Sequence, residues 1–183
     1  MPPDSGTGLE TRIGFQPVEP THYALLGGWL ATPHMRTWWG DPEEELGLIR
    51  DMVEGRDTTC PFLILLDGEP VGYIQNWFIG HYQNEEWIKD NPWLTGLPSE
   101  SVGVDICIGD ERRLSQGIGS AALHEFVTKL RIEGHATIII DPDPANVRAV
   151  RAYRKAGFVP IPELEGRTGD DVLIMQHHLK AIE

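Results

Sequence analysis

The chain has 183 residues, of which 40% are hydrophobic and 23% charged, a composition ordinary for one globular domain. Its 28 acidic and 15 basic residues leave a formal net charge of −13. A surface this acidic repels phosphate backbones, so we expect no nucleic-acid partner. The same charge aids solubility, and it also attracts cations to any cleft that gathers the carboxylates.

Metal, disulfide and membrane chemistry are not indicated either. The two cysteines do not form a CxxC pair, and the seven histidines show no metal-ligand spacing. No apolar run approaches the ~18 residues of a membrane span, and no secretory leader is visible at the N-terminus. We therefore expect a cytoplasmic protein, monomer or homodimer, that binds neither a metal nor a membrane.

The first half of the chain alternates between strand and helix patterns. Residues 1–9 are rich in Pro, Gly and Ser and are expected to form a disordered tail, ahead of a single domain over 10–183. Asp41-Pro42 is a helix-start signal, and Asp67-Gly68 is a hairpin-turn signal. The expected elements are a strand over 11–18, helices over 19–32 (limited by Pro33) and 41–55, strands over 61–66 and 70–78, and a long loop over 79–100.

The second half is more regular, because strands and helices follow one another closely. The segment 136–140 is short and rich in isoleucine, as in strands that are buried on both faces. The expected elements are strands over 101–108, 136–140 and 172–179, with helices over 117–133 and 144–156. This order predicts a mixed α/β fold.

A basic, glycine-bearing turn follows the strand that ends at Ile108. It runs from Arg112 to Ser120 and carries Gly117 and Gly119 at the start of a predicted helix. Unpaired amides and the helix dipole make a helix start an anion site, and glycines let a pyrophosphate approach those amides. A plain tight turn explains the same glycines, so this pattern alone does not identify a ligand.

A second pattern follows the isoleucine-rich strand. Pro142 and Pro144 end that strand, because proline cannot extend a sheet ladder. Asn146 then lies in the first turn of the next predicted helix, and Tyr153 lies two turns further along the same face. Taken alone, Asn146 is a helix cap and Tyr153 is a core aromatic residue.

Together these two segments resemble the GNAT superfamily of acetyltransferases. The glycine turn is similar to the acetyl-CoA pyrophosphate loop of that superfamily, and Asn146–Phe158 matches its N-x-x-A-x-x-x-Y-x-K-x-G-F helix. The turn departs from the pattern at Leu114, where the superfamily has Gln or Arg. The resemblance implies an acetyl-CoA-dependent N-acetyltransferase with a mixed α/β GNAT fold: a central, mostly antiparallel sheet, splayed at the acetyl-CoA strand and flanked by about four helices.

Within the superfamily, the chain is similar to the aminoglycoside 6′-N-acetyltransferases, which are antibiotic-resistance enzymes. The similar points are Trp38–Gly40, Gly68–Tyr73, Gly103–Asp105 and Asp141–Asn146. Those enzymes surround a polyamine sugar with carboxylates and tryptophans, so a small polycationic amine is the implied acceptor. The implied acceptor contacts are Trp39, Asp105, Asp141 and, from a loop similar to their substrate flap, Glu85, Glu86, Trp87 and Trp93.

The resemblance also implies roles in the reaction. Asp105 would take the proton of the attacking amine, directly or through water, or would orient that amine. Tyr153 would protonate the departing CoA thiolate. The implied cofactor contacts are Ile106, Cys107 and Ile108, which would pair with pantetheine as a strand would, and Arg113, Gln116, Gly117, Ile118, Gly119, Ser120 and Asn146.

Two other interpretations stay open. One is a GNAT enzyme that acetylates the amine or hydroxylamine of a siderophore precursor, or a protein N-terminus. The other is a non-catalytic acyl-CoA-binding domain, against which Tyr153 argues because a binding module needs no acid beside the thiol. The excess of carboxylates favours a polycation over a peptide.

Overall fold

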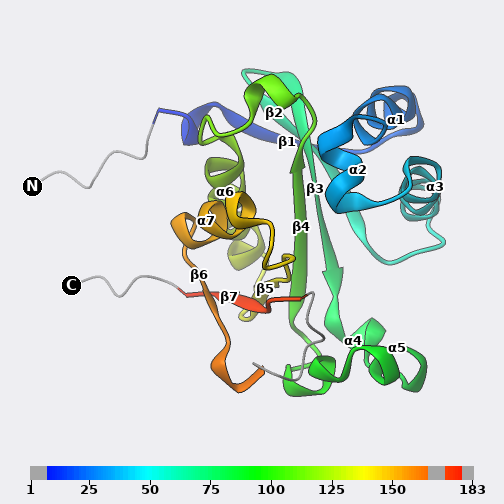
Figure 1. The fold of residues 1–183 in the computed structure, drawn as a ribbon, viewed down its shortest axis with the longest axis vertical. Helices are drawn as coiled ribbons and strands as arrows, with labels where there is room; N and C mark the ends of the chain where they lie inside the picture. The colour runs from blue at the N-terminus through cyan, green and yellow to red at the C-terminus, as the bar shows by residue number, and fades with distance from the viewer. Residues whose placement is uncertain (1–7, 165–171, 179–183) are drawn as a thin grey trace, which may run out of the picture. The chain divides into compact units, whose positions relative to one another are not determined.

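In the computed structural model, residues 8–164 and 172–178 are described, and they form seven α-helices and a seven-stranded sheet (Figure 1). The strands are β1 (Ile13–Pro17), β2 (Cys60–Leu66), β3 (Glu69–Phe78), β4 (Val102–Ile108), β5 (Ile138–Ile140), β6 (Phe158–Pro160) and β7 (Met175–His177). The helices are α1 (Tyr23–Leu30), α2 (Pro33–Trp39), α3 (Pro42–Val53), α4 (Ile79–Tyr82), α5 (Glu85–Asp90), α6 (Ile118–Ile132) and α7 (Val147–Lys155). None of these described helices is long and apolar enough to cross a membrane.

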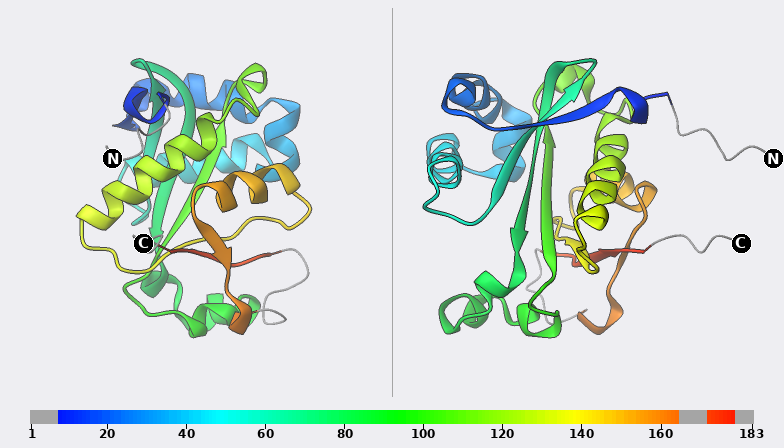
Figure 2. Two further views of the ribbon diagram at one scale, coloured as in Figure 1. Left: turned by 90° about the vertical axis from the view of Figure 1, so that its left-hand side faces the viewer. Right: turned by 180° about the vertical axis from the view of Figure 1, so that it is seen from behind.

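The sheet has the strand order β1-β2-β3-β4-β5-β7-β6. The pairs β1–β2, β5–β7 and β6–β7 are antiparallel, whereas β4 and β5 are parallel. Figure 2 shows the neighbouring strands β3 and β4 running side by side. The predicted mixed α/β class with a mostly antiparallel sheet is confirmed.

The described residues divide into two compact units, of which the first comprises the chain up to Gln75 together with Ile106–Glu125. In this unit α1, α2 and α3 pack on one another (Figure 1). Asp67 and Gly68 have positive φ angles and form the tight turn between β2 and β3, as the Asp-Gly signal predicts. An apolar core cluster of the first unit consists of Val18, Leu26, Leu30, Met35, Leu46, Ile49, Leu63 and Tyr73.

The second unit comprises Asn76–Asp105 and the described residues from Phe126 onward. Every residue of β5 is buried, as its apolar composition predicts. An apolar core of this unit consists of Ile79, Trp93, Leu94, Leu97, Ile139, Leu164 and Ile174. The single domain over 10–183 stays a prediction.

The first helical segment differs from its prediction. Instead of one helix over 19–32, Pro20–His22 forms a 3-10 turn and α1 begins at Tyr23. Pro33 bounds this segment as expected, but it also begins α2, where it takes the first helical position after the extended Thr32. A proline suits that position because the N–H it lacks would have no intrahelical partner there.

Three further segments differ from their predictions. The long loop over 79–100 contains α4, α5 and a 3-10 helix, η3 (Pro92–Gly96). β6 was not predicted, because so short a strand is defined by its pairing with β7 rather than by a local pattern. The strand expected over 172–179 is shortened to β7, and Leu179 lies outside the described residues, as does most of the predicted tail.

Candidate active site

β4 extends well beyond its pairing with β5. The described pairing ends where Gly103 lies opposite Ile139, whereas β4 continues to Ile108. β5 is followed by a proline-rich segment, and proline cannot donate to a sheet ladder. The predicted pantetheine partners lie on the part of β4 beyond this pairing, and they are Ile106, Cys107 and Ile108.

The glycine turn forms the start of α6. Ser115 and Gly117 have positive φ angles of 61° and 82°, and α6 begins at Ile118. Glycine adopts a positive φ without the steric cost that other residues meet, and the first amides of a helix have no intrahelical acceptor. The turn therefore presents the donors that a pyrophosphate needs. The predicted contacts in or next to it are Arg113, Gln116, Gly117, Ile118, Gly119 and Ser120.

Side-chain hydrogen bonds hold this turn in shape. Gln116 Nε2 donates to the Arg112 carbonyl at 2.7 Å, and Ser120 Oγ donates to the Gly117 carbonyl at 3.0 Å. The Asp110 carboxylate accepts hydrogen bonds from the side chain and backbone of Arg112, which lower the pKa of Asp110. Gln116 and Ser120 thus stabilise the turn itself, and their contact with a cofactor stays a prediction.

Asp105 and Asp141 lie close together in the second unit. Because β4 and β5 are parallel and Gly103 is opposite Ile139, the residues two positions further on come level with each other. Burial raises the pKa of Asp141 well above its usual range, and the negative charge of Asp105 raises it further. The fold therefore brings together two carboxylates that resist being ionised at the same time.

α7 carries two further predicted residues. Asn146 is its N-cap, and the side-chain oxygen of Asn146 accepts a hydrogen bond from the Ala149 amide at 3.2 Å. Tyr153 lies two turns further along α7 and is half-buried. The capping role of Asn146 is therefore visible, while its cofactor contact and the role of Tyr153 as an acid stay predictions.

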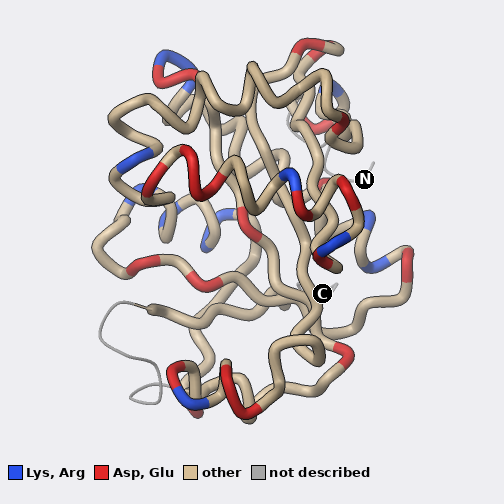
Figure 3. Tube along the Cα trace, turned by 90° about the vertical axis from the view of Figure 1, so that its right-hand side faces the viewer, with Lys and Arg blue, Asp and Glu red and all other residues tan. Residues whose placement is uncertain are grey.

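The acidic segment after β3 includes α5. Asn84 caps α5 by accepting a hydrogen bond from the Trp87 amide at 3.2 Å, and the side chains of Glu85 and Glu86 are exposed in the first turn. Trp87 is 46% exposed, and its ring lies edge-on to Tyr82 with 5.0 Å between centroids. Figure 3 shows that acidic residues also lie along many other elements. These three predicted contacts are therefore accessible to a ligand, although the negative charge is not confined to them.

The other two predicted tryptophans are more enclosed. Trp93 is only 4% exposed and belongs to the core of the second unit, with its ring centroid 6.5 Å from that of Trp77. Trp39, in the first unit, is half-buried and lies edge-on to Tyr73 at 5.8 Å. Trp93 therefore anchors η3 within that core. The acceptor contacts of both rings stay predictions.

Trp77 was not predicted as a site residue. Its ring lies against Gly103, where an added Cβ would come within 2.1 Å of the indole. Its Nε1–H is buried and has no hydrogen-bond acceptor among the described residues. Gly103 is therefore needed for the close approach of this indole, two residues before Asp105. In the sequence, this region was marked only by the similarity of Gly103–Asp105 to the aminoglycoside 6′-N-acetyltransferases.

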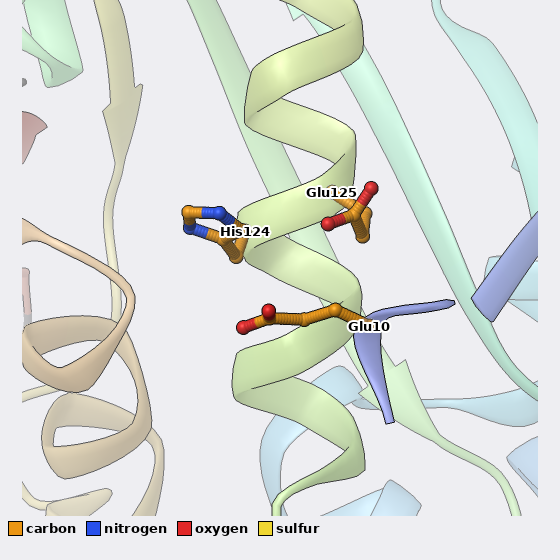
Figure 4. Close-up of side chains that lie close together, drawn as sticks. All are labelled: Glu10, His124 and Glu125. Atoms are coloured by element: carbon orange, nitrogen blue, oxygen red, sulfur yellow. The ribbon is translucent and has the colours of Figure 1, made fainter. Parts of the chain in front are cut away.

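One group of potential metal ligands occurs in the first unit (Figure 4). Glu10 begins the 3-10 helix η1 (Glu10–Arg12), and His124 and Glu125 lie on α6. Their ligand atoms are within 4.8 Å of one another, and His124 is exposed. Exposed acidic groups commonly gather in this way without an ion, so we assign no metal to this group.

Comparison with known proteins agrees with the motifs. The family model described as "Acetyltransferase (GNAT) domain" matches residues 19–165. The "Aminoglycoside N(6′)-acetyltransferase type 1" of Klebsiella pneumoniae is 30% identical over 143 residues, which cover 74% of this chain and 68% of that protein.

Solved structures have the same fold. The structure of aminoglycoside acetyltransferase AAC(6′)-Ib with coenzyme A and kanamycin has a TM-score of 0.73 and 25% identity, and the match covers 90% of this chain and 94% of that one. The aminoglycoside N(6′)-acetyltransferase of Legionella pneumophila has a TM-score of 0.69 and 21% identity, and the match covers 91% of each chain. The expected GNAT fold is confirmed. Because the family model spans most of the sequence, this chain belongs to the GNAT acetyltransferase family.

Proposed function

We propose that this chain transfers the acetyl group of acetyl-CoA to the 6′-amine of an aminoglycoside. The observation that carries the acceptor class is the Asp105–Asp141 pair, in which burial and repulsion raise the pKa of Asp141. An ammonium group beside the pair offsets that repulsion. A polycation supplies such an ammonium and still has another amine to react. The relative from Klebsiella pneumoniae, 30% identical, is named for this activity.

The cofactor part of the proposal rests on β4 and the glycine turn. The backbone of Ile106, Cys107 and Ile108 pairs with the pantetheine arm as an added strand would. The amides at the start of α6 bind the pyrophosphate, and the helix dipole favours its negative charge. A solved structure at 25% identity, which is described as a complex with coenzyme A, supports this choice of cosubstrate.

The reaction needs a neutral amine, because an ammonium has no free electron pair. The amine nitrogen attacks the thioester carbonyl, so that a C–N bond forms and the C–S bond breaks. Asp105 takes the proton that the amine loses, directly or through a water molecule. Tyr153 gives its hydroxyl proton to the CoA thiolate, since a phenol with a pKa of about 10 keeps its proton until a strong base appears.

The remaining acidic residues bind the rest of the acceptor. Asp141 pairs with a second ammonium group, and Glu85, Glu86 and Trp87 add charge and a ring face from the exposed side of α5. Each ion-paired hydrogen bond contributes about 1.5–3 kcal/mol before desolvation is deducted. Two or three of them contribute about 3–9 kcal/mol, of which the upper end corresponds to roughly micromolar binding, so a polyamine should bind more tightly than a mono-amine.

A thiol-release assay with acetyl-CoA and a panel of amines tests this proposal. We expect kanamycin and tobramycin to turn over, with a KM that rises steeply with salt because screening weakens the ion pairs. An aminoglycoside with a hydroxyl in place of the 6′-amine is the matched control and should release no thiol. If mono-amines, peptides or hydroxylamines react better than every aminoglycoside, the acceptor assignment is wrong.

A further inference from the structure

The last peptide of β4, between Ile108 and Gly109, is held from two sides within the first unit. The Gly109 amide donates to the Val71 carbonyl of β3 at 3.0 Å. The Ile108 carbonyl lies 3.0 Å from Nε2 of His34, the second residue of α2. The N–H and C=O of a trans peptide point in opposite directions. One hydrogen bond therefore holds this peptide to β3, and the other holds it to α2.

The chemistry of the bond fixes the protonation of one ring nitrogen. A carbonyl oxygen can only accept, so Nε2 of His34 must carry a hydrogen. Nδ1 of the same ring lies 3.2 Å from Thr32 Oγ1, and that hydroxyl donates to the Trp29 carbonyl at 2.6 Å. Thr32 is the residue immediately before α2. The single proton of that hydroxyl is given to Trp29, so Thr32 contacts Nδ1 without donating to it. The imidazole therefore lies between the start of its own helix and the end of β4.

Packing of Trp29 also restricts the peptide between Ile108 and Gly109. The indole of Trp29 occupies the space beside Gly109, and an added Cβ on that glycine would lie 2.0 Å from the ring. His34 is half-buried and Ile108 is buried, so the hydrogen bond between them is partly shielded from water. The end of β4 is thus held by the hydrogen bonds to His34 and Val71 and by packing against the indole of Trp29.

This peptide is the junction between the two proposed cofactor segments. Ile106–Ile108 lies directly before it, and the turn that starts at Asp110 and leads into α6 lies directly after it. A shift of the peptide would change the pantetheine-binding edge and the pyrophosphate-binding amides together. The side chain of His34 is bonded to its carbonyl.

We propose that His34 is a positioning residue for acetyl-CoA. By donating Nε2–H to the Ile108 carbonyl, it holds the end of β4 and the start of the glycine turn in the register that the cofactor needs. This inference rests on the proposed cofactor site. Because His34 acts on the cofactor strand and not on the reacting groups, its loss raises the KM for acetyl-CoA while kcat and the acceptor KM change little.

Two amide substitutions separate the hydrogen bond from general packing. In His34→Gln the side-chain NH₂ reaches about as far from Cβ as Nε2 of histidine does, whereas in His34→Asn it is one methylene short. We expect His34→Asn to weaken CoA binding and raise the acetyl-CoA KM by about tenfold, as for one lost hydrogen bond. His34→Gln should stay within about twofold of the parent protein.

Calorimetric titration with CoA gives the binding constants without relying on turnover, and melting curves check the fold. Arg36→Ala, on an exposed position of the same helix, is the control and should bind CoA like the parent. Equal CoA affinity in the Gln and Asn variants, or unfolding of both, would overturn the proposal. A parent protein that binds CoA but acetylates none of the amines contradicts the proposed acceptor and leaves this comparison intact. A parent that does not bind CoA overturns both.

Discussion

The glycine turn and the acidic pair are built in different ways. The turn relies on backbone shape: Gly117 has a positive φ, and α6 starts immediately after it. The acidic pair relies on two side chains: Asp105 lies in β4, and Asp141 directly follows the parallel strand β5. A backbone site is disturbed by changes of shape or charge within one short segment. A side-chain site is disturbed by the loss of a single oxygen or proton.

Neutralising Asp105 should have the largest effect on the acidic pair. Asp105→Asn removes the proposed proton acceptor and should lower kcat by about a thousandfold with kanamycin, the range expected for a lost general base. The CoA dissociation constant should stay close to that of the parent, because the cofactor contacts are backbone groups. A parent-like kcat in single-turnover measurements would remove Asp105 from the chemistry.

Tyr153→Phe tests the second reacting group. Loss of the hydroxyl proton should lower the single-turnover rate by about a hundredfold, since the thiolate then leaves without a donor. Single-turnover rates are needed because slow product release masks a change in chemistry. CoA affinity serves as the control and should be nearly unchanged. If the rate is also unchanged, the role of Tyr153 is packing on α7.

Gly119→Asp tests the backbone site with a misplaced charge. A carboxylate next to the bound pyrophosphate should weaken CoA binding by about thirtyfold, because like charges in contact repel strongly. Gly119→Ala is the matched control, since its Cβ would meet nothing closer than Ile108 Cγ1 at 3.9 Å. The Ala variant should bind CoA more tightly than the Asp variant, because it adds a Cβ beside the pyrophosphate but no charge. An Asp variant that binds CoA as tightly as the parent would show that the turn does not bind pyrophosphate.

Asp141→Asn tests whether Asp141 binds the acceptor rather than takes part in the reaction. Because Asp141 is proposed to bind an ammonium group rather than to react, the acceptor KM should rise by about tenfold and kcat should fall much less. Steady-state kinetics with kanamycin at low and high salt separates the two constants. A larger effect on kcat than on KM would place Asp141 among the reacting groups instead.

The stability of the free protein gives an independent check on the same residue. The pKa of Asp141 is raised by burial and by Asp105, so the folded state holds its proton more tightly than the unfolded state does. Its contribution to the free energy of unfolding is fully present below the unfolded pKa of about 4 and is lost as pH rises through the raised pKa. Melting curves should therefore show Asp141→Asn gaining stability relative to the parent as pH rises through that range. A pH-independent difference between the two proteins would contradict the shifted pKa.

The parts predicted correctly from the sequence are those with local signals. Gly117 was predicted to lie in a turn and has the positive φ that glycine favours there. Asn146 was predicted near a helix start and is the N-cap of α7. Pro33 was predicted only to limit the preceding helix, and the structure also uses it as the first residue of α2. The three isoleucines of β5 were correctly predicted to be buried.

The parts missed depend on neighbours that no local pattern specifies. Trp87 and Trp93 lie in the same predicted loop, and both were predicted to contact the acceptor. Trp87 is exposed, whereas Trp93 is buried in a core against which Trp77 packs. The sequence does not distinguish Gly103 from other strand glycines, because its close contact with the indole of Trp77 depends on the fold. His34 follows a proline at a helix start, and its hydrogen bond to Ile108 joins segments far apart in the chain. Tertiary register, which pattern and propensity do not encode, decides all three.

The proposed 6′-N-acetylation of an aminoglycoside is best tested by identifying the product. The protein is mixed with acetyl-CoA carrying a ¹³C-labelled acetyl group and with kanamycin, and the labelled nitrogen is assigned by NMR. We predict one acetyl group per kanamycin, on the 6′-nitrogen, with CoA released in equal amount. Label on another nitrogen would contradict the regiochemistry. Unlabelled kanamycin, under conditions where a mono-amine or a peptide acquires the label, would contradict the acceptor.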